Sequence, residues 1–453
     1  MVDRLHDPKY GRWAAQIRTT GGCSQPVHLR GRADYYDRAT GRLLHRYTTN
    51  TEPGGVLRVA CKTRRASRCP ACAETYRADT FQLIRAGLAG GKGVPETVAG
   101  HPCLFVTLTA PSFGPVHTRR EHAGRELPCH PRRDAGHCPH GRPISCTRRH
   151  GSDDPGLGDP LCPNCHDYPG AVLFNAHAPE LWRRFTIALR RTLARRAGLS
   201  VAEMADQLRV SFAKVAEYQR RGVVHLHAVI RLDGPDGPTE GPPAWATRDL
   251  LASAIEHAAG TAQVSTPAAE GLASRILRWG DQLDIRPVNL NGELTDEAVA
   301  GYVAKYATKA AETVGTLDRR ISPAEDIDQL PIRPHARRLI ACCLRLGELP
   351  ELQGLRLLAW AHMLGFRGHF STKSRRYSTT LGALRAARAD HQRERHVTTG
   401  RLPLFEEDTV LVVNHWQYAG RGHSPGDALL AAAVTGRTSV THATRGGPQP
   451  SWI

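Results

Sequence analysis

The sequence predicts an α+β protein, and three observations indicate that class. Short runs such as 105–109 and 223–232 alternate or concentrate apolar residues as β-strands do. Longer stretches, such as 171–197, repeat apolar residues at helical spacing. The two kinds of segment follow one another without the regular strand–helix–strand rhythm of a parallel sheet, which argues against a doubly wound fold.

Local patterns justify each expected element. Residues 171–197 predict a long basic helix, because one stripe of the segment is apolar and the rest carries arginines. Residues 208–218 and 223–232 predict two strands joined by a tight turn. The other expected elements are strands at 101–111 and 283–290, and helices at 73–89, 248–259, 295–311, 337–346, 352–364 and 381–396.

Two histidines, His225 and His227, lie on the second strand of the expected hairpin. Side chains alternate along a strand, so both imidazoles point to one face while their apolar neighbours point to the core. A three-residue loop that ends at Gly222 would place Glu217 opposite His225, on the same face. One carboxylate and two imidazoles would then form a metal site suited to phosphodiester chemistry.

Two alternatives remain open for this hairpin. A loop of two or four residues would turn Glu217 to the opposite face, so the third ligand depends on the register. Without a metal ion, His225 and His227 would be two half-exposed histidines of an ordinary strand.

A helix beginning after Thr295, a good N-cap residue, carries two tyrosines and two lysines on one face. Tyr302, Lys305, Tyr306 and Lys309 stand at positions i, i+3, i+4 and i+7. Phenols can act as nucleophiles, and the lysines would attract phosphate and stabilise a phenolate. The alternative is an amphipathic helix with half-buried tyrosines and solvated lysines.

The composition favours a polyanionic partner. The chain has 61 Lys and Arg against 43 Asp and Glu, a formal net charge of +18. With 453 residues, two or three domains are expected. Apolar runs are too short for a membrane span, and residues 1–13 lack the apolar core of a secretory signal. We therefore expect a cytoplasmic protein.

In that reducing compartment the 12 cysteines indicate metal binding rather than disulfides. Two Cys-Pro-x-Cys knuckles would each supply half of a tetrahedral zinc site, so two structural zinc ions are expected. The region 112–170 has no helical or strand periodicity, so it would need a bound metal ion to hold a fixed conformation. The first zinc site is expected at Cys23, Cys61, Cys69 and Cys72. The second is expected at Cys162 and Cys165 with two of Cys129, Cys138 and Cys146, of which Cys138 and Cys146 are favoured; His137, His140, His150 and His166 are also within reach.

Two basic segments are candidate DNA contacts. Arg220 and Arg221 lie in the hairpin loop, and Lys373, Arg375 and Arg376 lie in a basic run between two expected helices. Phosphate contacts would supply most of the affinity for DNA and make it salt-dependent. For the basic run, a solvated loop is the alternative.

Three motifs in this order resemble the HUH endonucleases that initiate rolling-circle replication. They are the Phe-x-Thr-Leu-Thr strand at 105–109, the His-Leu-His strand at 225–227 and the helix with the doubled tyrosine at 302–306. The doubled tyrosine resembles the two-tyrosine branch of that superfamily. The wider chain, from about residue 10 to 390, resembles RepSA-type replication initiators of actinobacterial plasmids and integrative conjugative elements. That likeness rests on residues 61–65, 69–74, 217–222 and 368–377.

The resemblance implies a central antiparallel sheet of HUH type flanked by helices, with Mg²⁺ or Mn²⁺ at Glu217, His225 and His227. It implies an enzyme that nicks and re-joins single-stranded origin DNA through a covalent 5′-phosphotyrosine intermediate on Tyr302 or Tyr306. A host helicase and a host polymerase would be further partners. A conjugative relaxase or transposase with the same chemistry, or a non-catalytic zinc-containing DNA-binding regulator, are the alternatives.

The expected domains follow the chain in order. They are an N-terminal zinc-knuckle region at 1–100, a catalytic domain at 101–315 with a zinc-stapled insertion at 112–170, a helical basic region at 316–400, and a C-terminal segment at 401–453 without a clear pattern.

Overall fold

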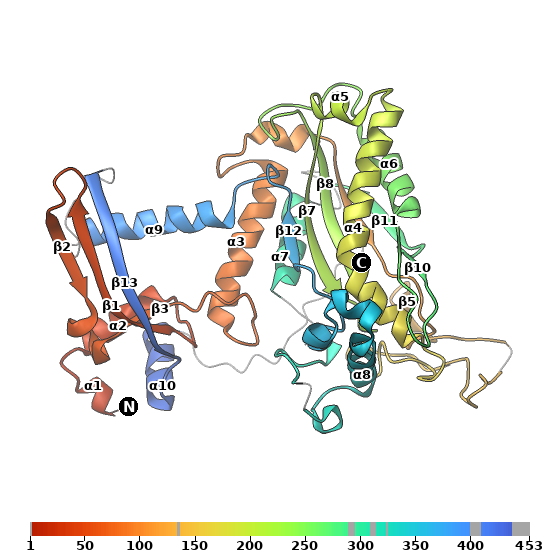
Figure 1. The fold of residues 1–453 in the computed structure, drawn as a ribbon, viewed down its shortest axis with the longest axis horizontal. Helices are drawn as coiled ribbons and strands as arrows, with labels where there is room; N and C mark the ends of the chain where they lie inside the picture. The colour runs from red at the N-terminus through yellow and green to blue at the C-terminus, as the bar shows by residue number, and fades with distance from the viewer. Residues whose placement is uncertain are drawn as a thin grey trace. The chain divides into compact units, whose positions relative to one another are not determined.

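A computed structural model describes residues 2–133, 136–288, 295–308, 314–322, 325–398 and 409–436. The chain divides into two compact units, one made of residues 1–78 with 382–453 and the other of residues 79–381 (Figure 1). This division differs from the linear domain order expected from the sequence, because C-terminal residues pair with an N-terminal strand. Within the described ranges, each helix is too short or too polar to span a bilayer.

The first unit is built on an antiparallel sheet with strand order β13-β1-β2, in which β3 also pairs with β1. Strand β13 lies along β1, with Val27 opposite Arg421 and Asp37 opposite Val410. Trp13 is fully buried and packs with Leu430 in a small core. The elements of this unit are α1 Val2–Leu5, α2 Tyr10–Thr19, β1 Val27–Asp37, β2 Leu43–Thr48, β3 Leu57–Val59, the start of α3 Pro70–Ala89, most of α9 Leu381–Thr398, β13 Val410–Arg421 and α10 Pro425–Val434.

The second unit contains a five-stranded sheet with strand order β11-β4-β8-β7-β12, and each neighbouring pair is antiparallel. The mixed helix and strand content and the antiparallel sheet confirm the α+β class. The elements of this unit are β4 Cys103–Leu108, β5 Arg120–His122, β6 Arg125–Leu127, α4 Tyr168–Arg196, α5 Val201–Ala205, β7 Arg209–Tyr218, β8 Val224–Asp233, α6 Arg248–Thr261, β9 Gln263–Ser265, β10 Ile276–Arg278, β11 Leu283–Pro287, α7 Asp296–Ala307, α8 Pro334–Glu348 and β12 Ser371–Lys373.

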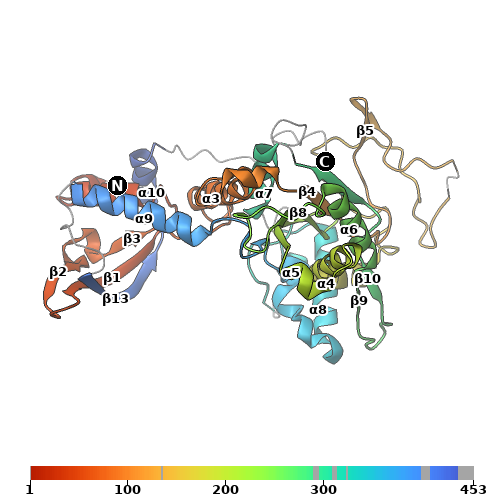
Figure 2. The same ribbon diagram turned by 90° about the horizontal axis from the view of Figure 1, so that it is seen from above.

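Helices cover both faces of this sheet. Every residue of β8 is buried, including two histidines, an arginine and an aspartate. Leu226, Ala228 and Ile230 belong to the main core, which includes the apolar stripe of α4. The opposite face of β8 carries the two histidines and is covered by α7. Figure 2 shows α4 and α7 on opposite sides of β8.

One expected helix is wrong. Residues 352–364 form two short 3-10 helices, Pro350–Leu355 and Leu358–Met363. The backbone of Arg356 and of Leu364 is left-handed, with φ of 54° and 51°, and each of these residues ends one of the two turns. Helical spacing of apolar residues therefore predicts a buried segment here but does not predict its 3-10 backbone conformation.

Candidate active site

The hairpin loop between β7 and β8 has three residues, as the glycine pattern predicts. Gln219 and Val223 close it with a 2.9 Å hydrogen bond from Gln219 N to Val223 O. Gly222 has φ +80°, and a Cβ there would lie 2.4 Å from Leu339 Cδ1. Both features require glycine. The resulting register places Glu217 directly opposite His225.

A buried asparagine of α4 fixes the end of this loop. Asn175 donates from Nδ2 to the carbonyls of Gly222 and Leu364, each at 2.9 Å, and its Oδ1 accepts from Val224 N at 2.9 Å. Asn175 is fully buried, so losing these partners would leave polar groups unsatisfied. Sequence reasoning missed this residue, although a lone asparagine inside an apolar helical run is a usable signal.

The structure brings Glu217, His225 and His227 to one point. Oε2 of Glu217 lies 3.1 Å from Nε2 of each histidine, and the two Nε2 atoms are 3.1 Å apart. Burial alone would raise the pKa of Glu217, but the two histidines hold that pKa well below its ordinary value. Burial lowers the pKa of His227 to about 4. A carboxylate and a neutral imidazole are the forms that bind a divalent cation.

The strand motif around Thr107 supports this group from β4. Thr107 pairs with His227 across the sheet, and its Oγ1 lies 3.0 Å from Nδ1 of His227. The ring of Phe105 stacks on the same imidazole, with centroids 5.8 Å apart and an interplanar angle of 5°. The motif therefore orients His227 so that Nε2 faces Glu217.

Helix α7 brings its two tyrosines to the same place. Thr295 caps the helix, accepting from Ala298 N at 3.1 Å. The hydroxyl of Tyr302 donates to Glu217 Oε2 at 3.0 Å and lies 2.9 Å from Nε2 of His227. The ring of Tyr306 lies 4.7 Å from that of Tyr302.

Both phenols are buried, at 6% and 2% exposure for Tyr302 and Tyr306. Burial, together with nearby Glu217, raises the pKa of each phenol. Lys305 is half-buried, with Nζ 5.4 Å from the centre of the Tyr306 ring. Lys309 lies outside the described residues.

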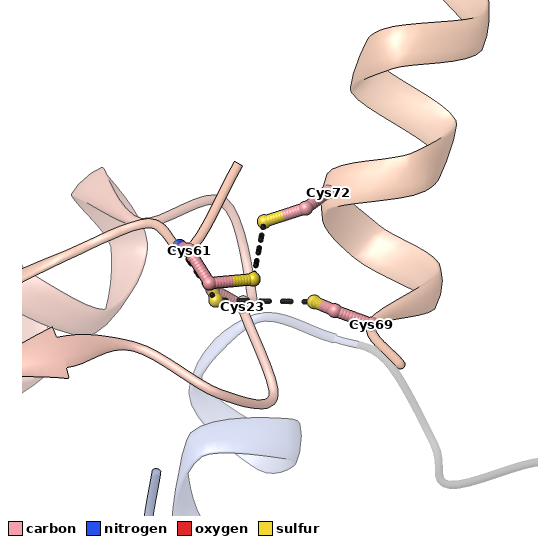
Figure 3. A group of neighbouring side chains, drawn as sticks. All are labelled: Cys23, Cys61, Cys69 and Cys72. Atoms are coloured by element: carbon pink, nitrogen blue, oxygen red, sulfur yellow. Dashed lines mark hydrogen bonds between the residues drawn. The ribbon is translucent and has the colours of Figure 1, made fainter. Parts of the chain in front are cut away.

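The first cysteine group lies in the first unit and contains the four expected residues (Figure 3). Sγ of Cys61 is 3.6 Å from that of Cys72, and Sγ of Cys69 is 3.8 Å from that of Cys23. A zinc ion about 2.3 Å from each of four tetrahedral sulfur atoms would give sulfur–sulfur distances of about 3.8 Å. Cys69 directly precedes α3 and Cys72 lies in its first turn, so the Cys-Pro-x-Cys knuckle is a helix start.

The second group differs from the expected one. Cys162 and Cys165 lie with Cys138, as expected, but their fourth neighbour is His140. Nδ1 of His140 is 3.2 Å from Sγ of Cys165. The assignment of Cys146 to this zinc site is wrong. Cys146 belongs to a third group, in which it lies with three residues that the sequence did not assign together: His117, Cys129 and His150.

Most of the candidate DNA-binding residues make contacts within the protein. Arg221 donates to the carbonyls of Ala110 and Pro111, each at 2.8 Å, and burial lowers its pKa to about 10. Arg220 binds backbone carbonyls of residues 152 and 154. Lys373 binds three backbone carbonyls near it, and Arg376 pairs with Asp236 at 3.0 Å. Arg375 is exposed.

An arginine-lined groove lies beside α4, where the sequence predicted only a basic helix. Its lining includes His257 of α6 and four arginines of α4: Arg183, Arg184, Arg191 and Arg195. Glu180 pairs with the first two arginines. The signal in the sequence was the spacing of Arg184, Arg191 and Arg195, which places them on one side of a helix.

Comparison with known proteins identifies the class of protein to which this chain belongs. A replication initiator protein from Streptomyces ambofaciens is 55% identical over 445 residues, covering 96% of this chain and 92% of that protein. A family model described as RepSA, "Replication initiator protein, pSAM2", matches residues 9–436. The chain therefore belongs to the RepSA family of replication initiator proteins, and as such it binds origin DNA. No solved structure matches it.

The matched range extends beyond the region where the sequence alone resembled that family. It reaches residue 436 and so includes β13 and α10. These elements complete the sheet and the small core of the first unit.

Proposed function

We propose that this replication initiator nicks one strand of its origin DNA and later re-joins it, through a covalent 5′-phosphotyrosine intermediate of the HUH type. The observation that carries the proposal is the position of the Tyr302 hydroxyl, 2.9 Å from His227 Nε2 and 3.0 Å from Glu217 Oε2. A nucleophile beside a two-histidine, one-carboxylate donor set is an arrangement suited to metal-assisted phosphodiester transfer.

The donor set fits a divalent cation. The three ligand atoms lie within hydrogen-bond distance of one another and face a common point. Mg²⁺ or Mn²⁺ held by Glu217, His225 and His227 would polarise the scissile phosphate and favour the phenolate over the phenol.

The chain's own residues supply the remaining chemistry. The Tyr302 phenol loses its proton as its oxygen attacks the phosphorus, and the bond from phosphorus to the 3′ oxygen breaks. The freed 3′ oxygen takes up a proton and becomes the hydroxyl that primes synthesis. The phosphotyrosine bond conserves the energy for re-joining, so ATP is not required. Tyr306, one helical turn away, is placed for a second cleavage after one round of replication. Lys305 provides positive charge beside that second ring.

Binding of duplex DNA would use surfaces outside this site. The groove beside α4 supports phosphate contacts, because Arg191 and Arg195 line it. Among the basic residues picked from the sequence, Arg375 fits such a role best, because it is exposed while Arg221 and Lys373 are committed to backbone carbonyls. Extension and unwinding would fall to a host polymerase and a host helicase.

A nicking assay tests the proposal directly. Purified protein is incubated with a supercoiled plasmid carrying the element's origin, with and without Mn²⁺, and the DNA-linked peptide is mapped by mass spectrometry. We expect metal-dependent nicking and an adduct on Tyr302 or Tyr306. His227→Ala should abolish nicking while binding to duplex origin stays within about twofold, because phosphate contacts carry most of the affinity. Full nicking by His227→Ala, or an adduct on another residue, would refute the mechanism.

A further inference from the structure

The second unit contains a third group of metal-ligand side chains, made of His117, Cys129, Cys146 and His150. Their donor atoms all lie within 4.8 Å of one another. Nδ1 of His117 is 3.9 Å from Sγ of Cys129, and Nε2 of His150 is 3.7 Å from Sγ of Cys146. These distances are close to the edges of a tetrahedron around zinc, at about 3.5–3.8 Å for mixed nitrogen and sulfur ligands.

Neighbouring residues hydrogen-bond to the candidate ligands of this group and orient them. Nδ1 of His150 lies 2.7 Å from Oδ2 of Asp154, which directs Nε2 of that ring toward Cys146. A carboxylate behind a ligand histidine is the usual outer contact of a zinc site. Sγ of Cys129 accepts from Thr118 N at 3.2 Å and lies 3.1 Å from Nδ1 of His130.

The group is also enclosed. Cys129 and His150 are each 1% exposed, and Cys146 is 9% exposed. The ligands come from two segments that contain little regular structure, one before β5 and one between β6 and α4. The backbones of His130 and Cys146 hydrogen-bond to each other at 2.8 and 2.9 Å. Without an ion, this segment would have few apolar contacts to hold it together.

The loop that follows His150 packs directly on the catalytic hairpin loop. Arg220 Nη2 donates to the carbonyl of Ser152 at 2.7 Å, and its Nη1 donates to that of Asp154 at 3.4 Å. Gly158 has φ +86°, and a Cβ there would lie 2.3 Å from the carbonyl carbon of Arg220. The two loops therefore touch backbone to backbone, and the contacting hairpin residue lies three positions after Glu217.

We infer that His117, Cys129, Cys146 and His150 form a third, structural zinc site, which holds the loop at 150–159 against the β7–β8 loop and so stabilises the hairpin register that places Glu217 opposite His225. The zinc site itself does not depend on the proposed nicking activity. Its positioning role rests on that activity, with Arg220 as the positioning residue that connects the two.

Metal content tests the site without reference to activity. Full-length protein purified without added zinc should contain about three zinc ions per chain by mass spectrometry, one for each cysteine group. The double variant Cys129→Ser/Cys146→Ser should contain about two, whereas Cys342→Ala, a buried cysteine of α8, should retain three. Two zinc ions per chain in the unaltered protein would overturn the third zinc site, even if the double variant did not fold. Three zinc ions per chain in the double variant would also overturn it.

The positioning role needs a different measurement. Arg220→Ala should keep three zinc ions but raise the Mn²⁺ concentration for half-maximal cleavage of a single-stranded origin oligonucleotide about tenfold. Arg220→Lys, which can still donate to the Ser152 carbonyl, should recover most of that loss. An unchanged Mn²⁺ requirement in Arg220→Ala would overturn the positioning role. If the unaltered protein contains three zinc ions but does not cleave, the proposed function fails and the zinc site stands.

Discussion

Thr107 Oγ1 lies 3.0 Å from Nδ1 of His227, on the side of the imidazole away from Glu217. When Nδ1 carries the ring proton it donates to this hydroxyl, and the lone pair of Nε2 then faces the candidate metal site. The Phe-x-Thr-Leu-Thr strand, an ordinary β-strand by its sequence alone, therefore has a specific task. It holds the ring of His227 with Nε2 toward Glu217.

The first prediction removes this contact. Thr107→Val keeps the shape of the side chain but cannot accept from Nδ1, so we expect the Mn²⁺ affinity to fall by about 10- to 100-fold, as for other outer contacts of ligand histidines. The measurement is the Mn²⁺ dependence of oligonucleotide cleavage. Thr107→Ser, which keeps the hydroxyl, is the matched control and should behave almost like the unaltered protein. Equal losses in both variants would point to packing rather than to the hydrogen bond.

The second prediction separates the two tyrosines. Phenylalanine keeps the ring packing of α7 and removes only the attacking oxygen. We expect Tyr302→Phe to reduce first-strand cleavage at least 100-fold, because the Tyr302 hydroxyl lies 3.0 Å from Glu217 Oε2 and 2.9 Å from His227 Nε2. Tyr306→Phe should cleave a simple oligonucleotide but fail to terminate replication cleanly. The double variant should fold and bind DNA without forming an adduct, and a covalent DNA adduct in that variant would end the hypothesis.

Part of this site could be predicted from the sequence because it depends on local rules. Strand parity and a glycine-ended loop were enough to place Glu217 opposite His225, since register in a hairpin follows from loop length. The contact of Tyr302 with Glu217 joins residues 85 positions apart. It depends on how α7 packs on the sheet, which no local pattern encodes.

The errors have the same origin. Cys146 was assigned to the second zinc site because many cysteines and histidines lie within reach in sequence, and only the chain path selects among them. The pairing of β13 with β1 joins residues nearly 400 positions apart. The sequence alone therefore predicts separate regions at 1–100 and 401–453, whereas β13 of the second region pairs with β1 of the first.

The third prediction concerns the first cysteine group. Cys72→Ser should remove about one zinc ion per chain and lower the melting temperature of the first unit by at least about 5 °C, which corresponds to ~2 kcal/mol for a unit of this size. The physical reason is that structural zinc binding contributes directly to folding. Cys103→Ala, a buried cysteine of β4 outside all three groups, should retain the full zinc content. A Cys72→Ser protein with unchanged zinc would exclude this residue as a ligand.

The fourth prediction concerns Lys214, on the core side of β7. This side chain is 7% exposed, with Nζ 5.8 Å from the centre of the Trp182 ring. Burial lowers the pKa of Lys214 from its ordinary 10.5 to about 8. Below pH 8 the folded and unfolded states both carry the proton, so the folded protein keeps a costly buried charge at neutral pH. Between pH 8 and 10.5 the unfolded state binds more protons, so this group's contribution to stability rises with pH.

Lys214→Met keeps the aliphatic stem and removes the charge. At pH 7 the variant should therefore be more stable, with a free energy of unfolding higher by about 3 kcal/mol, the value of 2.5 pKa units. The advantage should shrink as the pH rises from 8 toward 10, because the lysine then loses its proton in the folded state. Denaturant unfolding of both proteins at pH 7 and 9.5 gives the difference directly. Lys214→Arg stays charged over this range, so the difference in free energy of unfolding between Lys214→Arg and Lys214→Met should not shrink as the pH rises. If the stability advantage of Lys214→Met over the unaltered protein does not depend on pH, burial of the charge is not its cause.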